Sequence, residues 1–268
     1  KVAARKQKRA GKDVLRDIYD MCPEANSGEA GVTQNGKEFK VLSRKLISLP
    51  ESIGTLEGLE ALNLSCSQLL ELPHTIGGLK ALTMLDLSEC ASLTKLPGAI
   101  GELKALTELD LSKCSSLAAL PDAIGELGAL TALDLSACES LTALPDAIGE
   151  LKALTFLNLQ ECTSLAALPD TIGKLGSLTR LGLSGCTSLT YPPEEMRDSS
   201  LKTVGFCCLN LLEGGKVPVA DVKETVLHEI VFGGSADRID ALASKNSAFA
   251  EMTKSVRADF AALRKLRD

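Results

Sequence analysis

One motif recurs along most of this chain with a period of 24 residues, and such a period restricts the fold more than any other feature of the sequence. Its marker is a proline, found at Pro50, Pro73, Pro97, Pro121, Pro145, Pro169 and Pro193, with a first interval of 23 residues and five of 24. A cysteine recurs in the same way, at Cys66, Cys90, Cys114, Cys138, Cys162 and Cys186. Repeats of this length stack as equivalent coils, because one coil cannot bury its own apolar face.

Each repeat combines a strand pattern with a helical return path. The Leu-Asp-Leu of residues 133–135 alternates in the manner of a strand and places both leucines on one face. The proline suits the start of a short helix, since its φ is already fixed. The spacing of three between Ile100, Leu103 and Leu106 keeps the apolar side chains of the return path on one side. Gly101 is expected to let the backbone turn without steric cost.

The composition agrees with a narrow interior. The chain of 268 residues is 45% hydrophobic but only 3% aromatic, with no Trp, so its core must be built from Leu, Ile, Val and Ala. Its formal net charge of −6 makes it a poor candidate for a nucleic-acid binder, which needs clustered Lys and Arg. No run reaches the roughly 18 apolar residues that a membrane span needs.

Eight short strands are predicted to form one parallel sheet. They are expected near residues 39–41, 62–64, 85–87, 109–111, 133–135, 157–159, 181–183 and 204–206. The pattern Leu-x-x-Leu-x-Leu-x-x-Cys-x-x-Leu-x-x-Leu-Pro-x-x-Ile-Gly-x-Leu resembles the leucine-rich-repeat superfamily, and within it the intracellular type of plant immune receptors and Ras-associated proteins. The resemblance covers about residues 39–209. It implies an α/β solenoid in the shape of a horseshoe, with a curved parallel sheet on the concave face and a partner bound there.

From Cys90 to Cys186 the cysteine column occupies the position that in this family is usually Asn or Cys, where the side chain satisfies backbone groups in the turn after the strand. The first full repeat is one residue shorter and places Ser67 there, with Cys66 shifted by one. Two interpretations remain open: a buried column of thiols that pack as small apolar groups, which we favour, and a metal or redox ladder. Because the thiols would all point the same way, we expect no metal and no cofactor. His74 and His228 have no motif around them, and neither is expected to be a ligand. Regularly placed cysteines also favour reduced thiols in a cytoplasmic or organellar protein.

The outward positions of the strands are the candidate partner-binding residues. We single out Met84, Asp86, Glu108, Asp110, Asp134, Phe156, Asn158 and Arg180. Phe156 and Arg180 are the first candidates, because aromatic side chains and Arg are favoured interface anchors. Asp86, Asp110 and Asp134 follow one another on consecutive strands. They are interpreted either as a site for a basic segment or a cation, or as solvated side chains of the Leu-Asp-Leu-Ser pattern that is common in such repeats.

Both ends are predicted to be helical caps, which divides the chain into 1–38, the repeats at 39–209, and 210–268. Before Pro23, a helix is expected over 11–22, preceded by a basic arm that either touches an anionic surface or is a solvated tail; residues 24–36 should form a loop. A last helix carries one apolar face, formed by Phe249, Met252, Val256, Phe260 and Leu263. This helix is expected either to complete the cap or to dock onto a partner.

The function predicted from these features is protein binding without catalysis. The leading hypothesis is a scaffold or accessory subunit of a larger assembly, which binds protein partners through the concave sheet, the terminal helices or both. The alternative is the ligand-sensing module of a larger immune-type receptor or GTPase regulator. An enzyme is not expected, because the sequence has no nucleophile–base pair, no phosphate-binding glycine loop and no metal-ligand spacing.

Overall fold

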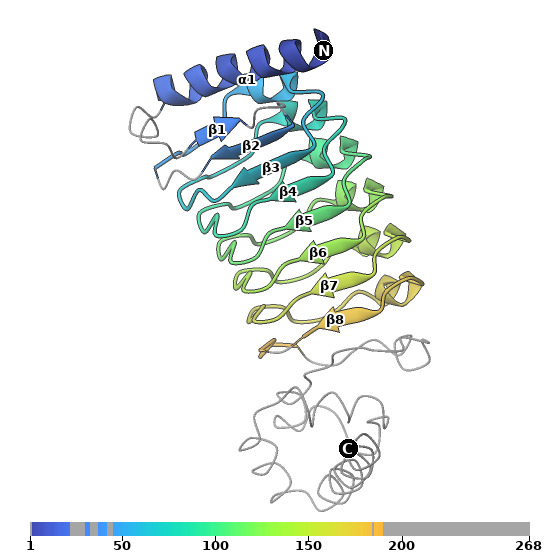
Figure 1. Cartoon of the computed structure of the whole chain (residues 1–268). Coiled ribbons are helices and arrows are strands. Elements are labelled where there is room, and N and C mark those ends of the chain that lie inside the picture. Colours follow the sequence, from blue (N-terminus) through green and yellow to red (C-terminus); the bar gives the residue numbers. More distant parts are fainter. Residues whose placement is uncertain (1, 22–29, 33–36, 42–44, 184, 190–268) are drawn as a thin grey trace, which may run out of the picture.

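The repeats form a solenoid whose strands pair side by side in sequence order. A computed structural model of the chain describes residues 2–21, 30–32, 37–41, 45–183 and 185–189. Its one sheet has eight strands, namely β1 (Ala30–Val32), β2 (Glu38–Val41), β3 (Ala61–Leu64), β4 (Met84–Asp86), β5 (Glu108–Asp110), β6 (Ala132–Asp134), β7 (Phe156–Asn158) and β8 (Arg180–Gly182). All neighbours from β2 to β8 are parallel, and β1 is antiparallel to β2 (Figure 1). The predicted solenoid is therefore confirmed.

The strands form where the Leu-x-Leu pattern predicts them, shifted by about one residue. Leu133 and Leu135 are fully buried, whereas Asp134 between them is only half-buried. Leu135 follows β6 directly, and its amide still bonds across to the next coil, to the Asn158 carbonyl at 2.8 Å. The pairing therefore extends past the strand ends. The strand expected at 204–206 and the helix that carries Phe249 to Leu263 lie outside the described residues.

The return paths are 3₁₀ helices of five residues each. They are η2 (Glu51–Thr55), η3 (His74–Gly78), η4 (Gly98–Glu102), η5 (Asp122–Glu126), η6 (Asp146–Glu150) and η7 (Asp170–Lys174). Each begins after a proline whose carbonyl accepts the amide of the isoleucine three residues on, as in Ile124 to Pro121 at 2.9 Å. A 3₁₀ helix has three residues per turn, so the spacing of Ile100, Leu103 and Leu106 places all three inside, where they are fully buried.

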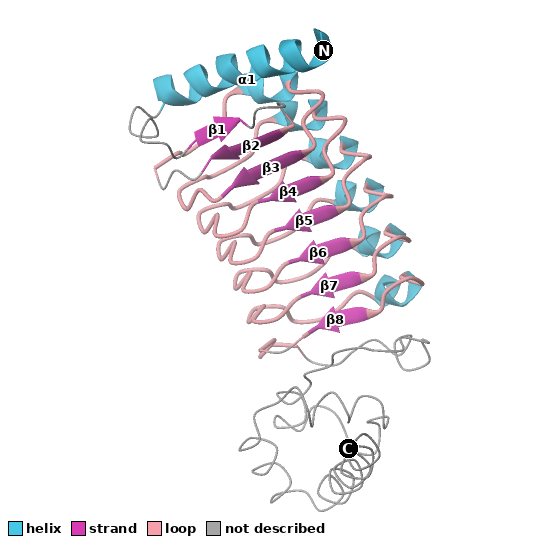
Figure 2. Cartoon of the chain, in the orientation of Figure 1, coloured by secondary structure: helices cyan, strands magenta, loops and turns pink. Residues whose placement is uncertain are grey.

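Strands and 3₁₀ helices lie on opposite sides of the stack (Figure 2). The sheet is open, and it is less curved than the horseshoe that the sequence led us to expect (Figure 1). An α-helix about 10 Å wide in each coil would hold the coils further apart on the far side than the strand spacing on the sheet side and so curve the sheet. The tighter 3₁₀ turns here stack more nearly at the strand spacing.

The glycine of each Ile-Gly pair permits close contact between coils. A Cβ on Gly101 would lie 2.7 Å from the Ala123 carbonyl oxygen of the next coil, and one on Gly125 would lie 2.5 Å from that of Ala147. Among the described glycines only Gly185 has a left-handed φ, at 81°. The expectation that Gly101 serves a turn was therefore wrong: its missing side chain leaves room for the neighbouring coil.

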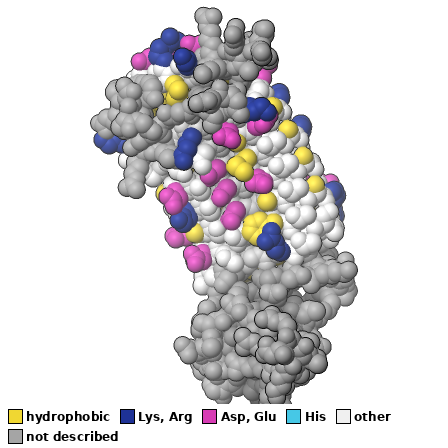
Figure 3. Space-filling view, viewed as in Figure 1, with side chains coloured by type: hydrophobic (Ala, Val, Ile, Leu, Met, Phe, Trp, Pro, Cys, Tyr) yellow, Lys and Arg dark blue, Asp and Glu magenta, His cyan; other side chains and the backbone are white. Residues whose placement is uncertain are grey.

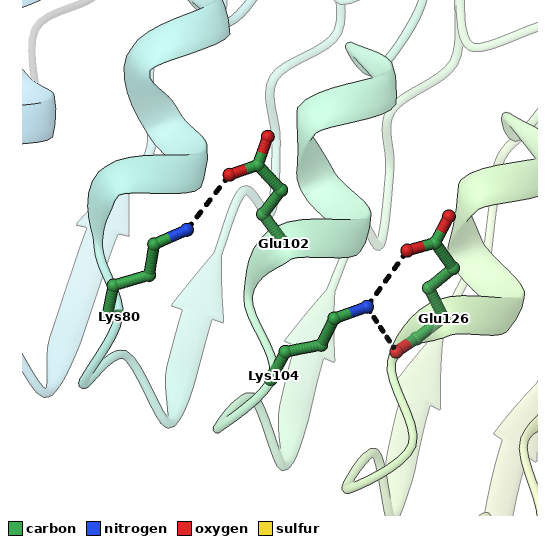
Figure 4. A network of polar contacts seen from close by, with 4 residues as sticks. All are labelled: Lys80, Glu102, Lys104 and Glu126. Atoms are coloured by element: carbon green, nitrogen blue, oxygen red, sulfur yellow. Dashed lines mark hydrogen bonds and ion pairs between the residues drawn. The ribbon is translucent and has the colours of Figure 1, made fainter.

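Lysines and glutamates link successive coils on the helical side of the stack (Figure 4). Lys80 Nζ lies 2.9 Å from Glu102 Oε2, and Lys104 Nζ lies 2.9 Å from Glu126 Oε2. The ammonium of Lys80 also lowers the pKa of Glu102. Because these pairs are exposed to solvent, they contribute little to folding. This series of Lys–Glu pairs ends at the next coil, because Gly128 stands at the position that Lys80 and Lys104 occupy in the two coils before it.

The N-terminal helix α1 (Val2–Met21) begins nine residues earlier than expected. The basic segment is thus its first half and not an extended arm, which agrees with the high helix propensity of Lys, Arg, Gln and Ala. Val14 and Ile18 are fully buried in the same core as the repeat leucines, and the Ser52 hydroxyl donates to Asp17. The loop predicted over 24–36 contains strand β1. No helix among the described residues is long and apolar enough to cross a membrane.

Candidate partner-binding face of the sheet

The eight outward residues singled out from the sequence lie together on one face of the sheet, here called the sheet face. Two adjacent rows cross it. The first row runs Met84, Glu108, Ala132, Phe156, Arg180, and the second runs Asp86, Asp110, Asp134, Asn158. Acidic side chains gather over the middle strands with hydrophobic ones between them (Figure 3). Met84 is 44% exposed, which is high for a large apolar side chain on a folded domain.

A hollow of about 260 Å³ lies in the centre of the sheet face. Its lining is Met84, Leu85, Asp86, Glu108, Leu109, Asp110, Ala132, Asp134 and Phe156. Six of the eight predicted residues thus line one hollow, while Asn158 and Arg180 lie beyond its edge. Sequence reasoning missed Ala132, although a small residue between Glu108 and Phe156 in the row was a usable signal for a gap.

The aspartate row closes the turn after each strand. Asp86, Asp110 and Asp134 each accept, through Oδ1, the backbone amide of the serine two residues on, at 2.8 to 2.9 Å. At each end of the row a side-chain amide donates a hydrogen bond to the last aspartate: Asn63 donates to Asp86, and Asn158 donates to Asp134 Oδ2 at 3.1 Å. The aspartates are therefore half-buried groups with a structural role, which neither interpretation of the sequence included.

Asn63 shows what happens when the turn is shortened. Only two residues separate Asn63 from Cys66, whereas three separate Asp86 from Cys90. The Oδ1 atom of Asn63 is buried and accepts no hydrogen bond. A full-length turn is thus needed to bring the backbone amide to this side chain.

Asp134 should matter more for folding than Asp110. Asp134 accepts from the Ser136 amide, the Ser136 hydroxyl and Asn158, whereas Asp110 accepts only the Ser112 amide and lies between two carboxylates. We expect Asp134→Ala to lower the free energy of unfolding by about 1–2 kcal/mol more than Asp110→Ala. Urea denaturation with a shared slope measures the difference. An equal or larger loss from Asp110→Ala would contradict this assignment.

Phe156 and Arg180 contact each other. The guanidinium carbon of Arg180 lies 4.6 Å from the centroid of the Phe156 ring, which is a cation–π distance. Arg180 is exposed and Phe156 is half-buried. The pair is held by β7 and β8, so it presents a preformed aromatic and cationic edge beside the hollow.

The cysteine column is buried behind the sheet. Each Sγ donates to a backbone carbonyl of an earlier coil, as in Cys114 to Leu87 at 3.2 Å and Cys138 to Leu111 at 3.2 Å. Burial raises the pKa of Cys90 to about 11 and that of Cys138 to about 12. Burial also raises the pKa of Cys114 and Cys162. The six described cysteines are free thiols, and no group of metal-ligating side chains converges among the described residues. His74 is exposed at the start of η3, and His228 lies outside the described residues.

Comparison with known proteins identifies the class to which these repeats belong. Residues 39–134 match a family model described as a leucine-rich repeat region. The repeats belong to the leucine-rich-repeat superfamily, as their sequence motif, their parallel sheet and this match agree. No curated protein matches the sequence.

Solved structures similar to this chain include two that are described as leucine-rich-repeat proteins. The leucine-rich-repeat domain of the type III effector XopL is 30% identical with a TM-score of 0.53, over 59% of this chain and 56% of that one. A leucine-rich-repeat protein of Leptospira interrogans is 24% identical with a TM-score of 0.42, over 68% and 56%. In the Drosophila Toll–Spatzle complex the values are 22% and 0.46, over 61% and 21%. The chain thus spans little more than half of the first two relatives.

Proposed function

We propose that this chain is a protein-interaction module, a scaffold or accessory subunit of a larger assembly, which binds a protein partner on the sheet face. Leucine-rich-repeat folds commonly mediate protein–protein interaction and are typically not enzymes. The observation that supports the proposal here is the hollow over Ala132, which is lined by the large apolar side chains of Met84 and Phe156 together with four carboxylates. Fully desolvated pockets with aromatic or Arg anchors at their edge are where binding free energy concentrates in interfaces.

The rigidity of the sheet face also supports this function. The Thr131 and Thr155 hydroxyls each donate at 3.0 Å to the carbonyl of the corresponding threonine in the preceding coil, Thr107 and Thr131 respectively. Asp134 is fixed by three hydrogen bonds. A surface that is already ordered loses less side-chain entropy when a partner binds, so more of the contact energy remains as affinity.

Capture of partners from native extract tests the proposal. Wild type is compared with a sheet-face variant, Phe156→Ala with Arg180→Ala, and with a matched variant of the helical side, Lys80→Ala with Lys104→Ala. A fourth sample is the chain ended at residue 232, which lacks the predicted docking helix. Circular dichroism confirms that each sample is folded. We expect a partner that is retained by the Lys80/Lys104 variant and lost from the sheet-face variant.

A partner lost only on truncation would contradict this proposal, because binding would then belong to the last helix.

The alternative function, a sensor module in a larger receptor, differs in which further domains the repeats are attached to. The sequence of the full-length gene product distinguishes it: a signalling domain in the same chain would favour the sensor.

A further inference from the structure

The hollow carries negative charge that no cation of the described residues neutralises. Four carboxylates line it, those of Asp86, Glu108, Asp110 and Asp134. The Glu108 carboxylate has no hydrogen bond or ion pair within the part of the chain that the structure describes, and Asp110 accepts a hydrogen bond only through Oδ1. Lys113 lies near enough for Asp110 to raise its pKa, but its ammonium binds Glu89 at 2.8 Å, and Glu89 is the main cause of the shift. The hollow thus favours a cationic occupant.

The size of the hollow selects a single side chain as that occupant. Small-molecule and cofactor sites usually enclose roughly 300–1,000 Å³, and this hollow is smaller, at about 260 Å³, and open to solvent. Among its lining residues, the small Ala132 lies between Glu108 on one neighbouring strand and Phe156 on the other. Apolar walls suit the methylene stem of a long basic residue, and the carboxylates suit its charged end.

Arginine fits this arrangement better than lysine. The guanidinium of Arg180 already packs over the Phe156 ring. The register places Arg180 and Ala132 on opposite sides of Phe156, so the ring also borders the hollow with its other side. Glu108 and Asp110 lie two residues apart on the same face of β5, so their carboxylates can together accept the several donors of a planar guanidinium, whereas an ammonium is a compact point charge.

We propose that the hollow over Ala132 receives an arginine side chain of the protein partner. The inference rests on the proposed function and names the chemistry of its contact: an arginine stem between Met84 and Phe156, and a guanidinium bound by Glu108 and the second oxygen of Asp110. An acidic partner segment is excluded by repulsion. A metal ion is a poor occupant, because the aspartates already bond backbone amides and no set of ligands converges among the described residues.

Nuclear magnetic resonance of the full chain labelled with ¹⁵N tests the inference. The probe is N-acetyl-arginine methylamide, compared with the citrulline analogue, which keeps the shape and lacks the charge, and with the lysine analogue. We expect saturable shifts at the amides of Asp110, Ala132 and Asp134, and binding weaker by about tenfold or more for citrulline. Ala132→Phe fills the hollow and should abolish the shifts. Ala118→Phe, at an exposed position outside the hollow, should leave them unchanged.

Three results would overturn the inference: no saturable shifts, equal binding of citrulline or lysine analogues, or unchanged binding by Ala132→Phe. If the probe fails while the sheet-face variant still loses its captured partner, the arginine inference is wrong and protein docking on the sheet face stands. If the probe binds as predicted but no sheet-face change affects capture, the proposed function is wrong.

Discussion

The repeats should lose much of their stability when the pH is raised from about 8 to about 10, because their buried thiols ionise only in the unfolded chain. The pKa of an ordinary thiol here is 9.0, whereas burial raises that of Cys90 and Cys186 to about 11 and that of Cys138 to about 12. Above the unfolded pKa the folded chain holds more protons, so stability falls with rising pH until the folded pKa is reached. Each thiol contributes about 1.4 kcal/mol per pH unit in this window.

The expected loss in the free energy of unfolding is large because several thiols contribute to it. Burial raises the pKa of five thiols, those of Cys90, Cys114, Cys138, Cys162 and Cys186. Together they should remove on the order of 7 kcal/mol by about pH 10. A domain is typically stable by about 5–15 kcal/mol, so this loss is comparable with the whole free energy of unfolding. Urea denaturation at several pH values measures it.

A double variant separates the thiols from other groups that titrate in the same range. Cys114→Ala with Cys138→Ala removes two of the five thiols, so the loss of stability between about pH 8 and about pH 10 should fall by roughly two fifths. The free energy of unfolding of each protein at the higher pH is compared with that of the same protein at the lower pH. The loss of stability caused by the smaller alanine side chains is present at both pH values and cancels. An unchanged pH dependence in the double variant would contradict the account of the cysteine column.

Two glycines only three residues apart should respond to the same substitution in opposite directions. Gly125→Ala would place a Cβ 2.5 Å from the Ala147 carbonyl oxygen and 2.9 Å from its Cβ, so one coil must move away from the next. We expect a loss of about 1–3 kcal/mol in the free energy of unfolding. Gly128→Ala meets nothing within 4 Å, and its φ is not left-handed. That variant should gain about 0.4–1 kcal/mol, since alanine restricts the unfolded chain.

Thermal and urea denaturation of the two variants measure this difference. Gly128→Ala serves as the matched control for unfolded-state entropy, which the two substitutions share. Equal effects would mean that the coils are not in the close contact described here.

The coarse fold could be predicted from the sequence because a repeat multiplies a weak local signal. The alternation at 133–135 is short, but its recurrence fixes the strand order and the register. The outward rows follow at once, which is why Met84, Phe156 and the aspartates were found together. The buried positions of Ile100 and Leu103 follow in the same way from their spacing.

Other features depend on how one coil meets the next, which spacing within a repeat does not encode. The role of Gly101 is set by the Ala123 carbonyl of the following coil. The aspartates close turns through backbone amides whose positions follow only from the fold. The hollow exists because Ala132 is small and its neighbours in the row are large, and this is a relation across strands. The length of α1 was underestimated because its basic first half lacks apolar periodicity.

The most direct test of the central claim is photocrosslinking from two positions in native extract. Photoreactive benzoylphenylalanine replaces either Met84, at the rim of the hollow, or Lys104, on the helical side. If the sheet face binds the partner, the Met84 position should crosslink to a protein that the Lys104 position does not reach, and Ala132→Phe should abolish that product. A product from the Lys104 position alone, or one that Ala132→Phe leaves unchanged, would contradict the account.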